Sequence, residues 1–517
     1  LKGVDKAEIK RVALSTTIVT NTLVEGKEDR AALFLLPGPG LNLAGLTPVE
    51  PVVLAGYTDH RGREAAAPER GEVKSVCQKF KKSAAGFQAA AVAGKFSVRN
   101  PAAELVVAEW VAEFLNPAHI TVGSEISGTL NFLRRANSAY YNAAVWRTFQ
   151  NFRAEIALAL ERRGLKAPVY VLKADGGTMP LATAAKLPVE AIFTGPAASV
   201  MGVMALAKLT EGQAVSLDIG GTTTDIALWQ NQAPLLAPGG AKINAFPTVV
   251  RSFWLRSVGV GGDSYVRREN GELKVGPVRL GPAMALAGTS PTVFDAVRYL
   301  ELSDYGSKEK AAQAMSLLAE KDEPLAAVAA QVVEKAASLI AAAIKEMLNE
   351  KQALPVYKVA DIVKETQFYP DAIIGVGGAA KGLAEKVAQQ FNIPCQIPPD
   401  ALLANAVGAA SAKPTTAVTL RADTTEGYYS VPELLLKKPL KRSYFDLKEA
   451  WDLAEKHLRE RAAALHIPPE AANSTERVYE EEFSVIRGFQ TMGKIITCKL
   501  QICPGILYQE GVRRNVQ

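Results

Sequence analysis

The feature that most constrains this chain is a Gly-rich bend between two apolar runs, within residues 214–229. The runs 214–219 and 226–229 are predicted to be the two strands of a β-hairpin. Asp218 precedes the bend and Asp225 follows it. The bend itself consists of Gly220, Gly221, Thr222, Thr223 and Thr224.

A bend of this composition can bind phosphate. Glycine lets the backbone approach a ligand closely, so its N–H groups can reach phosphate oxygens. A carboxylate beside such a bend suits Mg²⁺, which prefers oxygen ligands and usually keeps several waters. The alternative is an ordinary hairpin with a polar tip. The complete pattern Asp-x-Gly-Gly-Thr-x-Thr-Asp, set between two buried strands, favours nucleotide phosphate binding.

Length and composition limit the remaining possibilities. A chain of 517 residues predicts more than one domain, because single cores stop growing well below this size. The net charge of +6 is spread along the chain, so no nucleic-acid partner is expected. Four cysteines fit a reducing compartment and predict a cytoplasmic protein. No uncharged run reaches the ~18 residues of a membrane helix, so no membrane partner is expected.

Strand-like and helix-like segments alternate along most of the chain, which predicts an α/β fold. Buried strands are expected at 89–93, 168–172 and from 372, and helices at 101–115, 131–163, 199–208 and 380–391. A polar loop is expected at 123–128. From about residue 416 the pattern changes to that of a small α+β domain, in which we identify no catalytic motif.

Several loops between these elements are candidate ligand sites. Asp175 follows the strand 168–172, and ligands of open α/β sheets bind beyond the carboxyl ends of strands. Gly195 opens a predicted helix, whose N-terminus could bind an anion. Gly-rich turns also contain Gly261 and Gly262, and Gly377 and Gly378. Tight helix packing explains the last pair equally well.

Two polar turns near the beginning of the chain are weaker candidates. Thr16 and Thr17 follow a short predicted strand, where hydroxyls can contact phosphate or simply cap a helix. Asp59, His60 and Arg61 share one turn and could orient a small polar substrate. The residues themselves favour a surface turn with local ion pairs.

Taken together and in this order, the segments resemble the hydantoinase A/5-oxoprolinase family of the actin-like ATPase superfamily. The segments that carry the resemblance are 15–27, 173–179, 194–199, 218–225, 259–264, 291–296 and 375–379. Ser15 and Asp175 stand where the family usually has Gly and Asn. Ala379-Ala-Lys381 replaces its Gly-Pro-Leu-His, so no histidine role is carried over there.

The resemblance implies a duplicated, RNase H-like, two-lobed ATPase fold of the actin, Hsp70 and sugar-kinase type, with a small α+β C-terminal domain. We expect residues 1–205 to be the remainder of the N-terminal lobe, 206–415 the second nucleotide-binding lobe, and 416–517 the C-terminal domain. The family has two Asp-x-Gly-Gly-Thr loops. The first would precede Leu1. We expect that the sequence is truncated there; the alternatives are that another chain supplies the loop or that this protein cannot turn over ATP.

The resemblance also implies ATP and Mg²⁺ as cofactors. Asp218 would bind the metal, and Asp218, Asp225 and Asp175 would be the catalytic carboxylates. The nucleotide would contact Gly220, Gly221, Thr222, Thr223, Thr224, Gly195, Gly261, Gly262, Gly377, Gly378, Thr16 and Thr17. Asp59, His60 and Arg61 would lie on the substrate side.

The implied reaction is hydrolysis of a cyclic amide, such as a hydantoin or 5-oxoproline, by phosphoryl activation of the amide oxygen. One alternative is an ATP-dependent carboxylase subunit that acts on a small ketone, of the acetone or acetophenone carboxylase type. Another is a non-catalytic nucleotide switch or assembly subunit. The family further implies a B-type partner subunit or a homo-oligomer. A histidine-rich binuclear amidohydrolase is not expected, because the four histidines form no His-x-His pair.

Overall fold

The structure is a computed structural model that describes residues 5–82, 86–354, 368–434, 436–440 and 445–507. Contacts divide the chain into two compact units, each built from separate segments of the sequence. The described residues of unit 1 lie within 5–194, 238–252 and 412–507, and those of unit 2 lie within 195–237 and 253–411.

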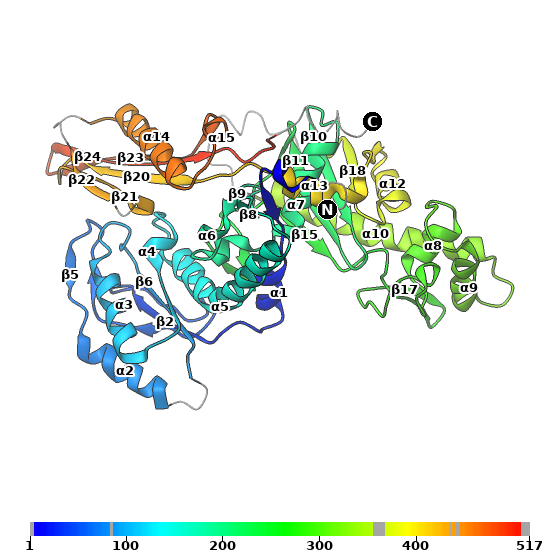
Figure 1. Cartoon of the computed structure of the whole chain (residues 1–517), viewed down its shortest axis with the longest axis horizontal. Helices are drawn as coiled ribbons and strands as arrows, with labels where there is room; N and C mark the ends of the chain where they lie inside the picture. The colour runs from blue at the N-terminus through cyan, green and yellow to red at the C-terminus, as the bar shows by residue number, and fades with distance from the viewer. Residues whose placement is uncertain (1–4, 83–85, 355–367, 435, 441–444, 508–517) are drawn as a thin grey trace. The chain divides into compact units, whose positions relative to one another are not determined.

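The central sheet of unit 2 contains the predicted hairpin (Figure 1, green to yellow). Its strands are β10 (Gln213–Ile219), β11 (Thr224–Gln230), β12 (Ala233–Pro234), β15 (Leu255–Val258), β18 (Ala372–Val376) and β19 (Cys395–Gln396). β10 and β11 are antiparallel, with Asp218 opposite Asp225. β15 pairs antiparallel with β11, whereas β18 and then β19 continue parallel from β10. The predicted hairpin is confirmed.

Helices supply much of the rest of the core of unit 2. They are α7 (Thr194–Leu206), α8 (Val293–Tyr299), α9 (Lys308–Leu318), α10 (Leu325–Gln352), α12 (Ala380–Phe391) and α13 (Ala404–Ser411). Unit 2 also contains a short antiparallel pair, β16 (Val266–Glu269) with β17 (Glu272–Val275). A second such pair, β13 (Lys242–Ile243) with β14 (Phe246–Pro247), belongs to unit 1. α7 begins at Thr194, five residues before the predicted start, so Gly195 lies inside its first turn.

The apolar positions of α10 recur at helical spacing, from Val328 through Ala336 to Met347, and they are buried in the core. By length and composition, this is the one helix in the described part of the chain that could cross a membrane. However, 56% of its most apolar window is buried within the fold, as is typical of a core helix.

A parallel four-stranded sheet forms the first layer of unit 1. Its strands are β3 (Val52–Val53), β2 (Ala31–Leu36), β6 (Ala89–Gly94) and β7 (His119–Val122), in that order. Both faces are covered: Phe34 packs with α2 (Arg70–Lys82) and α3 (Ala102–Leu115), and Leu33 packs with α5 (Phe132–Arg162). Burial on both faces explains why these strands are uniformly apolar in sequence.

One sequence expectation in this region is wrong. Residues 123–128 were expected to be a polar loop, but Gly123–Ile126 form a one-turn helix, α4. The buried carboxylate of Glu104 accepts hydrogen bonds from the backbone N–H groups of Ser124 and Gly94. This contact with a distant helix fixes the turn, so the local sequence alone does not predict it.

Unit 1 also contains a three-stranded sheet of β1 (Val12–Leu14), β8 (Val169–Leu172) and β9 (Thr178–Pro180). Its short elements are α1 (Ile18–Val24), β4 (Tyr57–Thr58), β5 (Glu64–Ala66) and α6 (Leu181–Ala184). The long helix α5 is continuous, although the sequence alone did not exclude one break in it.

The last part of unit 1 is an antiparallel sheet with order β22-β21-β20-β24-β23. Its elements are β20 (Ala417–Asp423), β21 (Tyr428–Val431), β22 (Leu436–Pro439), α14 (Leu447–Ala464), α15 (Pro469–Ala472), β23 (Thr475–Arg487) and β24 (Gln490–Ile502). Helix α14 packs on one face through Trp451 and Leu458. The contacts of this sheet group it with residues 1–194.

Candidate functional site

The bend between β10 and β11 is held by hydrogen bonds to a second Gly-rich turn, at residues 259–263. Gly220 N–H donates to Thr223 O at 3.0 Å and closes the bend. Gly262 N–H donates to Gly220 O at 2.9 Å, and Thr224 Oγ1 donates to Val260 O at 2.7 Å. Thr224 therefore faces inward, while Gly221 and Thr222 at the tip are exposed.

Glycine is required where these turns meet. A Cβ atom on Gly261 would lie 2.7 Å from the backbone oxygens of Gly220 and Gly221. Gly377, at the end of β18, has φ +93°, and its Cβ would lie 2.4 Å from Asp218 Oδ1. Three Gly-rich turns thus converge at the carboxyl end of β10, which leaves their backbone close to the space beside Asp218. Gly378 is less constrained, since its Cβ would meet only a leucine side chain at 3.5 Å.

Asp218 and Asp225 form a pair of partly enclosed carboxylates on the same face of the hairpin, because they are directly opposite in register. Burial raises the pKa of Asp218. The hydrogen bond from Ser199 Oγ to Asp218 Oδ2 acts in the opposite direction and lowers this pKa in part. Burial also raises the pKa of Asp225 to about 6, and the Asp218 charge adds to this shift while Ser257 opposes it.

A divalent cation fits this pair. Two carboxylates that repel one another are stabilised by a shared positive charge, and carboxylate oxygens are ligands that Mg²⁺ prefers. Among the described residues, no group of three or more His, Cys, Asp or Glu side chains could hold a metal. A metal beside Asp218 would therefore take its other ligands from water or phosphate oxygens, as Mg²⁺ does in phosphate sites.

Two residues that the sequence did not single out position Asp218. Ser199, on α7, donates to the carboxylate, and Asn405 Nδ2, on α13, donates to Ser199 Oγ at 3.2 Å and to Gly195 O at 2.8 Å. The two helices approach closely, since a Cβ on Gly408 would lie 1.9 Å from Ala198 O. The small residues in 195–199 and 404–411 were a visible signal of this packing.

Thr16 and Thr17 lie in unit 1, and Thr16 contacts Thr194, the last residue of the same segment of unit 1. Thr16 N–H donates to Thr194 Oγ1 at 2.8 Å, and this hydroxyl donates to Thr16 O at 2.6 Å. Thr16 Oγ1 also accepts from Ile18 N–H at 3.3 Å, at the start of α1. The bond from Ile18 N–H to Thr16 forms a Ser/Thr turn before α1, whereas Thr17, the N-cap residue, makes no side-chain capping bond. A role in phosphate binding stays a prediction.

Asp175 lies after β8 in unit 1 and is only 2% exposed. It accepts hydrogen bonds from Gly177 N–H at 3.1 Å and from Gln501 Nε2 at 3.0 Å, and Lys173 Nζ lies 3.5 Å away. Asp175 lines a cavity of about 120 Å³ within unit 1. Gln501 belongs to the C-terminal sheet, where the sequence showed no catalytic motif.

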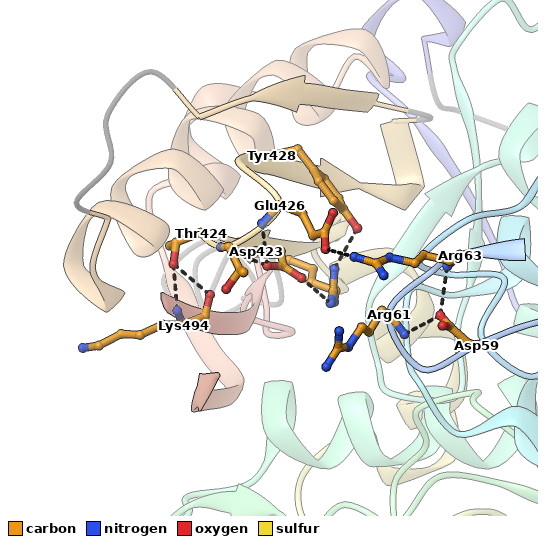
Figure 2. A network of polar contacts seen from close by, with 10 residues as sticks. Asp59, Arg61, Arg63, Asp423, Thr424, Glu426, Tyr428 and Lys494 are labelled. Atoms are coloured by element: carbon orange, nitrogen blue, oxygen red, sulfur yellow. Dashed lines mark hydrogen bonds and ion pairs between the residues drawn. The ribbon is translucent and has the colours of Figure 1, made fainter. Parts of the chain in front are cut away.

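Asp59, His60 and Arg61 lie in the turn between β4 and β5. Figure 2 shows this turn opposite the turn that contains Asp423 and Glu426. Asp59 Oδ1 accepts from Arg61 N–H at 2.8 Å and from Arg63 N–H at 2.9 Å, so Asp59 caps its own turn. Arg63 donates to Glu426 at 2.7 Å, whereas His60 is exposed. A substrate role for the three residues stays a prediction.

Comparison with known families gives two matches. The model for Hydantoinase/oxoprolinase matches residues 135–418, and the model for the Hydantoinase/oxoprolinase N-terminal region matches residues 2–115.

Two curated proteins share part of the sequence. The 5-oxoprolinase of Saccharomyces cerevisiae is 25% identical over 261 residues, which is 48% of this chain and 19% of the yeast protein. The alpha subunit of caprolactamase from Pseudomonas jessenii is 25% identical over 216 residues, which is 40% of this chain and 31% of that subunit. The match thus spans less than a third of either relative.

Two solved structures share the fold over nearly the whole chain. Acetone carboxylase in its nucleotide-free form, an enzyme of ATP-dependent acetone carboxylation, aligns with a TM-score of 0.67 and 16% identity. The alignment covers 96% of this chain and 79% of the acetone carboxylase chain. ATP-dependent caprolactamase from Pseudomonas jessenii aligns with a TM-score of 0.65 and 18% identity, over 97% and 80%. At these identities the likeness shows the fold, a mixed α/β architecture.

Proposed function

Because the chain belongs to the hydantoinase/oxoprolinase family, we propose that it is an ATP-dependent hydrolase that opens a cyclic amide of the hydantoin or 5-oxoproline type. The observation that carries the proposal is the convergence of three Gly-rich turns beside the paired carboxylates Asp218 and Asp225. This arrangement combines backbone donors for phosphate with oxygen ligands for Mg²⁺.

The strand order of unit 2 supports the finer fold assignment. Three antiparallel strands (β15, β11 and β10) are followed by two parallel strands (β18 and β19). This is the order of an RNase H-like lobe, the building block of actin-like ATPases. We assign that lobe to residues 206–415 and the remainder of a second lobe to residues 1–205.

Each residue of the site has a task in this reaction. Bound ATP would supply the phosphoryl group that makes the amide oxygen a leaving group. The N–H groups of the bend would hold phosphate oxygens, and Asp218 would hold Mg²⁺. Ser199 fixes the orientation of the Asp218 carboxylate, and Asn405 fixes Ser199. The Asp225 carboxylate would accept a proton from the attacking water.

A ketone carboxylase subunit is the second candidate, and the likeness to acetone carboxylase over 96% of this chain supports it. A partner subunit is proposed in either case, because one relative is named as an alpha subunit. A cytoplasmic location belongs to the same proposal. A non-catalytic nucleotide switch is the third candidate.

Phosphate release from Mg-ATP separates these candidates. The whole chain is assayed with 5-oxoproline, hydantoin, and acetone plus bicarbonate, beside an Asp218→Asn control. Stimulation by a cyclic amide, lost in the control, is the expected result. Stimulation by the ketone alone would favour the carboxylase. Tight Mg-ATP binding by calorimetry, without stimulation by any of these compounds, would favour the switch.

A further inference from the structure

The turn at 259–263 brings a third carboxylate to the tip of the bend. Asp263 N–H donates to Gly221 O at 2.6 Å. A Cβ atom on Gly221 would lie 2.7 Å from Asp263 Oδ2, so this carboxylate lies against the exposed tip. Because a carboxylate repels phosphate, Asp263 by itself would oppose phosphate binding there. A cation beside Asp263 is therefore needed if the tip is to hold phosphate.

Arg279 is that cation. Its Nε and Nη2 groups donate to Asp263 Oδ2 at 3.0 and 2.9 Å. Both bonds go to one oxygen from one edge of the guanidinium group, which has five N–H donors in all. The Nη1 group makes no hydrogen bond within the described residues, and the Arg279 side chain is 46% exposed. The second edge of the guanidinium group is thus available to a ligand.

Backbone hydrogen bonds fix the loop that carries Arg279. Tyr265 N–H donates to Val278 O at 2.9 Å, and Gly276 N–H donates to Tyr265 O at 3.0 Å. Val278 directly precedes Arg279, and Tyr265 follows Asp263 by two residues. The two segments that carry the ion pair are therefore held together by the backbone. The position of the guanidinium group beside the tip follows from the fold rather than from the ion pair alone.

The charges around the bend make this cation important. Asp218, Asp225 and Asp263 are acidic, and a nucleoside triphosphate brings further negative charge, which one Mg²⁺ neutralises only in part. Within the described part of unit 2, no other lysine or arginine forms an ion pair with any of these three residues. A guanidinium group suits the task, because it stays charged and can donate two parallel hydrogen bonds to phosphate.

We propose that Arg279 binds the phosphate chain of the nucleotide through the free edge of its guanidinium group. Asp263 is a positioning residue, which holds the other edge and so orients the group. This inference rests on the proposed function, because it takes the bend as the nucleotide site. It deepens that function by naming a cationic residue of the site, one that also offsets charge on the phosphate oxygens during phosphoryl transfer.

Calorimetry with Mg-ATP on the whole chain tests the role of Arg279. We expect Arg279→Gln to weaken binding about 10-fold or more, and Arg279→Lys to weaken it about 3-fold, since lysine keeps the charge but not the paired donors. Arg256→Gln is the matched control, because Arg256 pairs with Glu346 and Glu350 and makes no ion pair with the bend. Unchanged affinity in Arg279→Gln, or an equal loss in the control, would overturn the proposal.

A double-mutant cycle tests Asp263 as a positioning residue. In the parent chain, Asp263→Asn removes the partner that orients Arg279, and we expect Mg-ATP affinity to fall about 3-fold. In the Arg279→Gln background only the repulsion of phosphate is left to remove, so the same substitution should raise the affinity about 3-fold. A merely structural role would give the same effect in both backgrounds, and that result would overturn the positioning role.

Chemical labelling gives a readout that does not depend on activity. Phenylglyoxal modifies accessible arginines, and mass spectrometry of the digested whole chain measures the labelling of each one. Saturating Mg-ATP should slow the labelling of Arg279 about 10-fold or more and leave that of Arg256 unchanged, because a guanidinium group that is bonded to phosphate is shielded. Labelling of Arg279 that ignores Mg-ATP would contradict the contact.

Failure of this inference is distinguishable from failure of the proposed function. If Arg279→Gln weakens Mg-ATP binding but no cyclic amide stimulates hydrolysis, the role of Arg279 stands and the hydrolase assignment falls. If a cyclic amide stimulates hydrolysis equally in Arg279→Gln and the parent chain, with equal Mg-ATP affinity, the hydrolase assignment stands and this inference falls. The thermal midpoint without nucleotide should change little in the Arg279 variants, since exposed ion pairs contribute little to stability.

Discussion

Gln501 Nε2 donates to Asp175 Oδ2 across 3.0 Å, although the two residues are 326 positions apart in the sequence. Through this bond, the strand β24 contributes to the environment of a carboxylate that follows β8. The C-terminal sheet therefore supplies a hydrogen-bond donor to Asp175, one of the candidate site residues.

The first prediction concerns this bond. Gln501→Ala removes a donor from the buried Asp175 carboxylate, which should lower the free energy of unfolding by about 1–3 kcal/mol. Gln490→Ala, at an exposed position of the same strand, should have no effect. Chemical denaturation of the two variants beside the parent chain checks this, and equal midpoints for all three would show that the bond is unimportant.

The second prediction separates binding from stability at the paired carboxylates. Burial raises the pKa of the Asp225 carboxyl group to about 6, so this group is ionised at pH 8 and repels Asp218. Asp225→Asn removes that repulsion. Unfolding without metal should therefore cost about 1–3 kcal/mol more than in the parent. The same variant, and Asp218→Asn, should lose the increase in thermal midpoint that Mg-ATP produces. A full Mg-ATP shift in both variants would contradict the assignment of the metal site.

The third prediction tests the backbone contact between two turns. Gly261→Ala places a Cβ 2.7 Å from the oxygens of Gly220 and Gly221, so the bend must shift. We expect a loss of about 1–3 kcal/mol of stability and weaker ATP binding. Gly281→Ala is the matched control, since no atom lies within 4 Å of its added Cβ. Calorimetry with Mg-ATP and thermal denaturation would measure both effects.

The fourth prediction asks whether Asp59 is structural or acts on substrate. Asp59→Asn keeps an oxygen that can accept from Arg61 and Arg63, whereas Asp59→Ala does not. Hydrogen exchange of the amides in 59–66 should therefore quicken in the Ala variant only. Loss of activity in Asp59→Asn with unchanged exchange would instead indicate direct action on the substrate.

The fifth prediction concerns acid sensitivity. His119 stacks on Trp146 with ring centroids 4.6 Å apart, and burial lowers its pKa from 6.5 to about 4. A lowered pKa means that stability is complete above pH 6.5 and falls as the pH drops toward 4. The loss should be about 1 kcal/mol at pH 5, allowing for partial exposure. His119→Phe keeps the stacking and should reduce the slope of unfolding free energy against pH. An unchanged slope would count against this assignment.

Local patterns predicted the elements of the fold but few of the contacts around the carboxylates. The hairpin, the uniformly apolar strand 89–93 and the helix 101–115 follow from residue periodicity, which is a local property. Gly261 and Gly377 were visible in the sequence. The reason that glycine is needed at these positions is the close approach of other parts of the chain, which is a tertiary contact.

The partners of the carboxylates depend on packing between distant segments. Ser199 donates to Asp218, and Asn405 can donate to Ser199 because α7 and α13 pack closely. Glu190 and Lys499 line the same cavity as Asp175, although they are far apart in sequence. No pattern within a short window contains this information. The family resemblance located the Asp175 loop but not the surrounding charges. The boundaries at 205 and 415 stay predictions.

The discontinuous make-up of unit 1 has a consequence for synthesis. A ribosome that has just added Asp175 must add 326 more residues before Gln501 exists. At usual elongation rates this takes roughly 15–65 s, far longer than a helix or a hairpin needs to form. During that interval the carboxylate must stay hydrated or find a temporary donor. The Asp175 carboxylate therefore cannot reach its final set of partners until β24 has been synthesised.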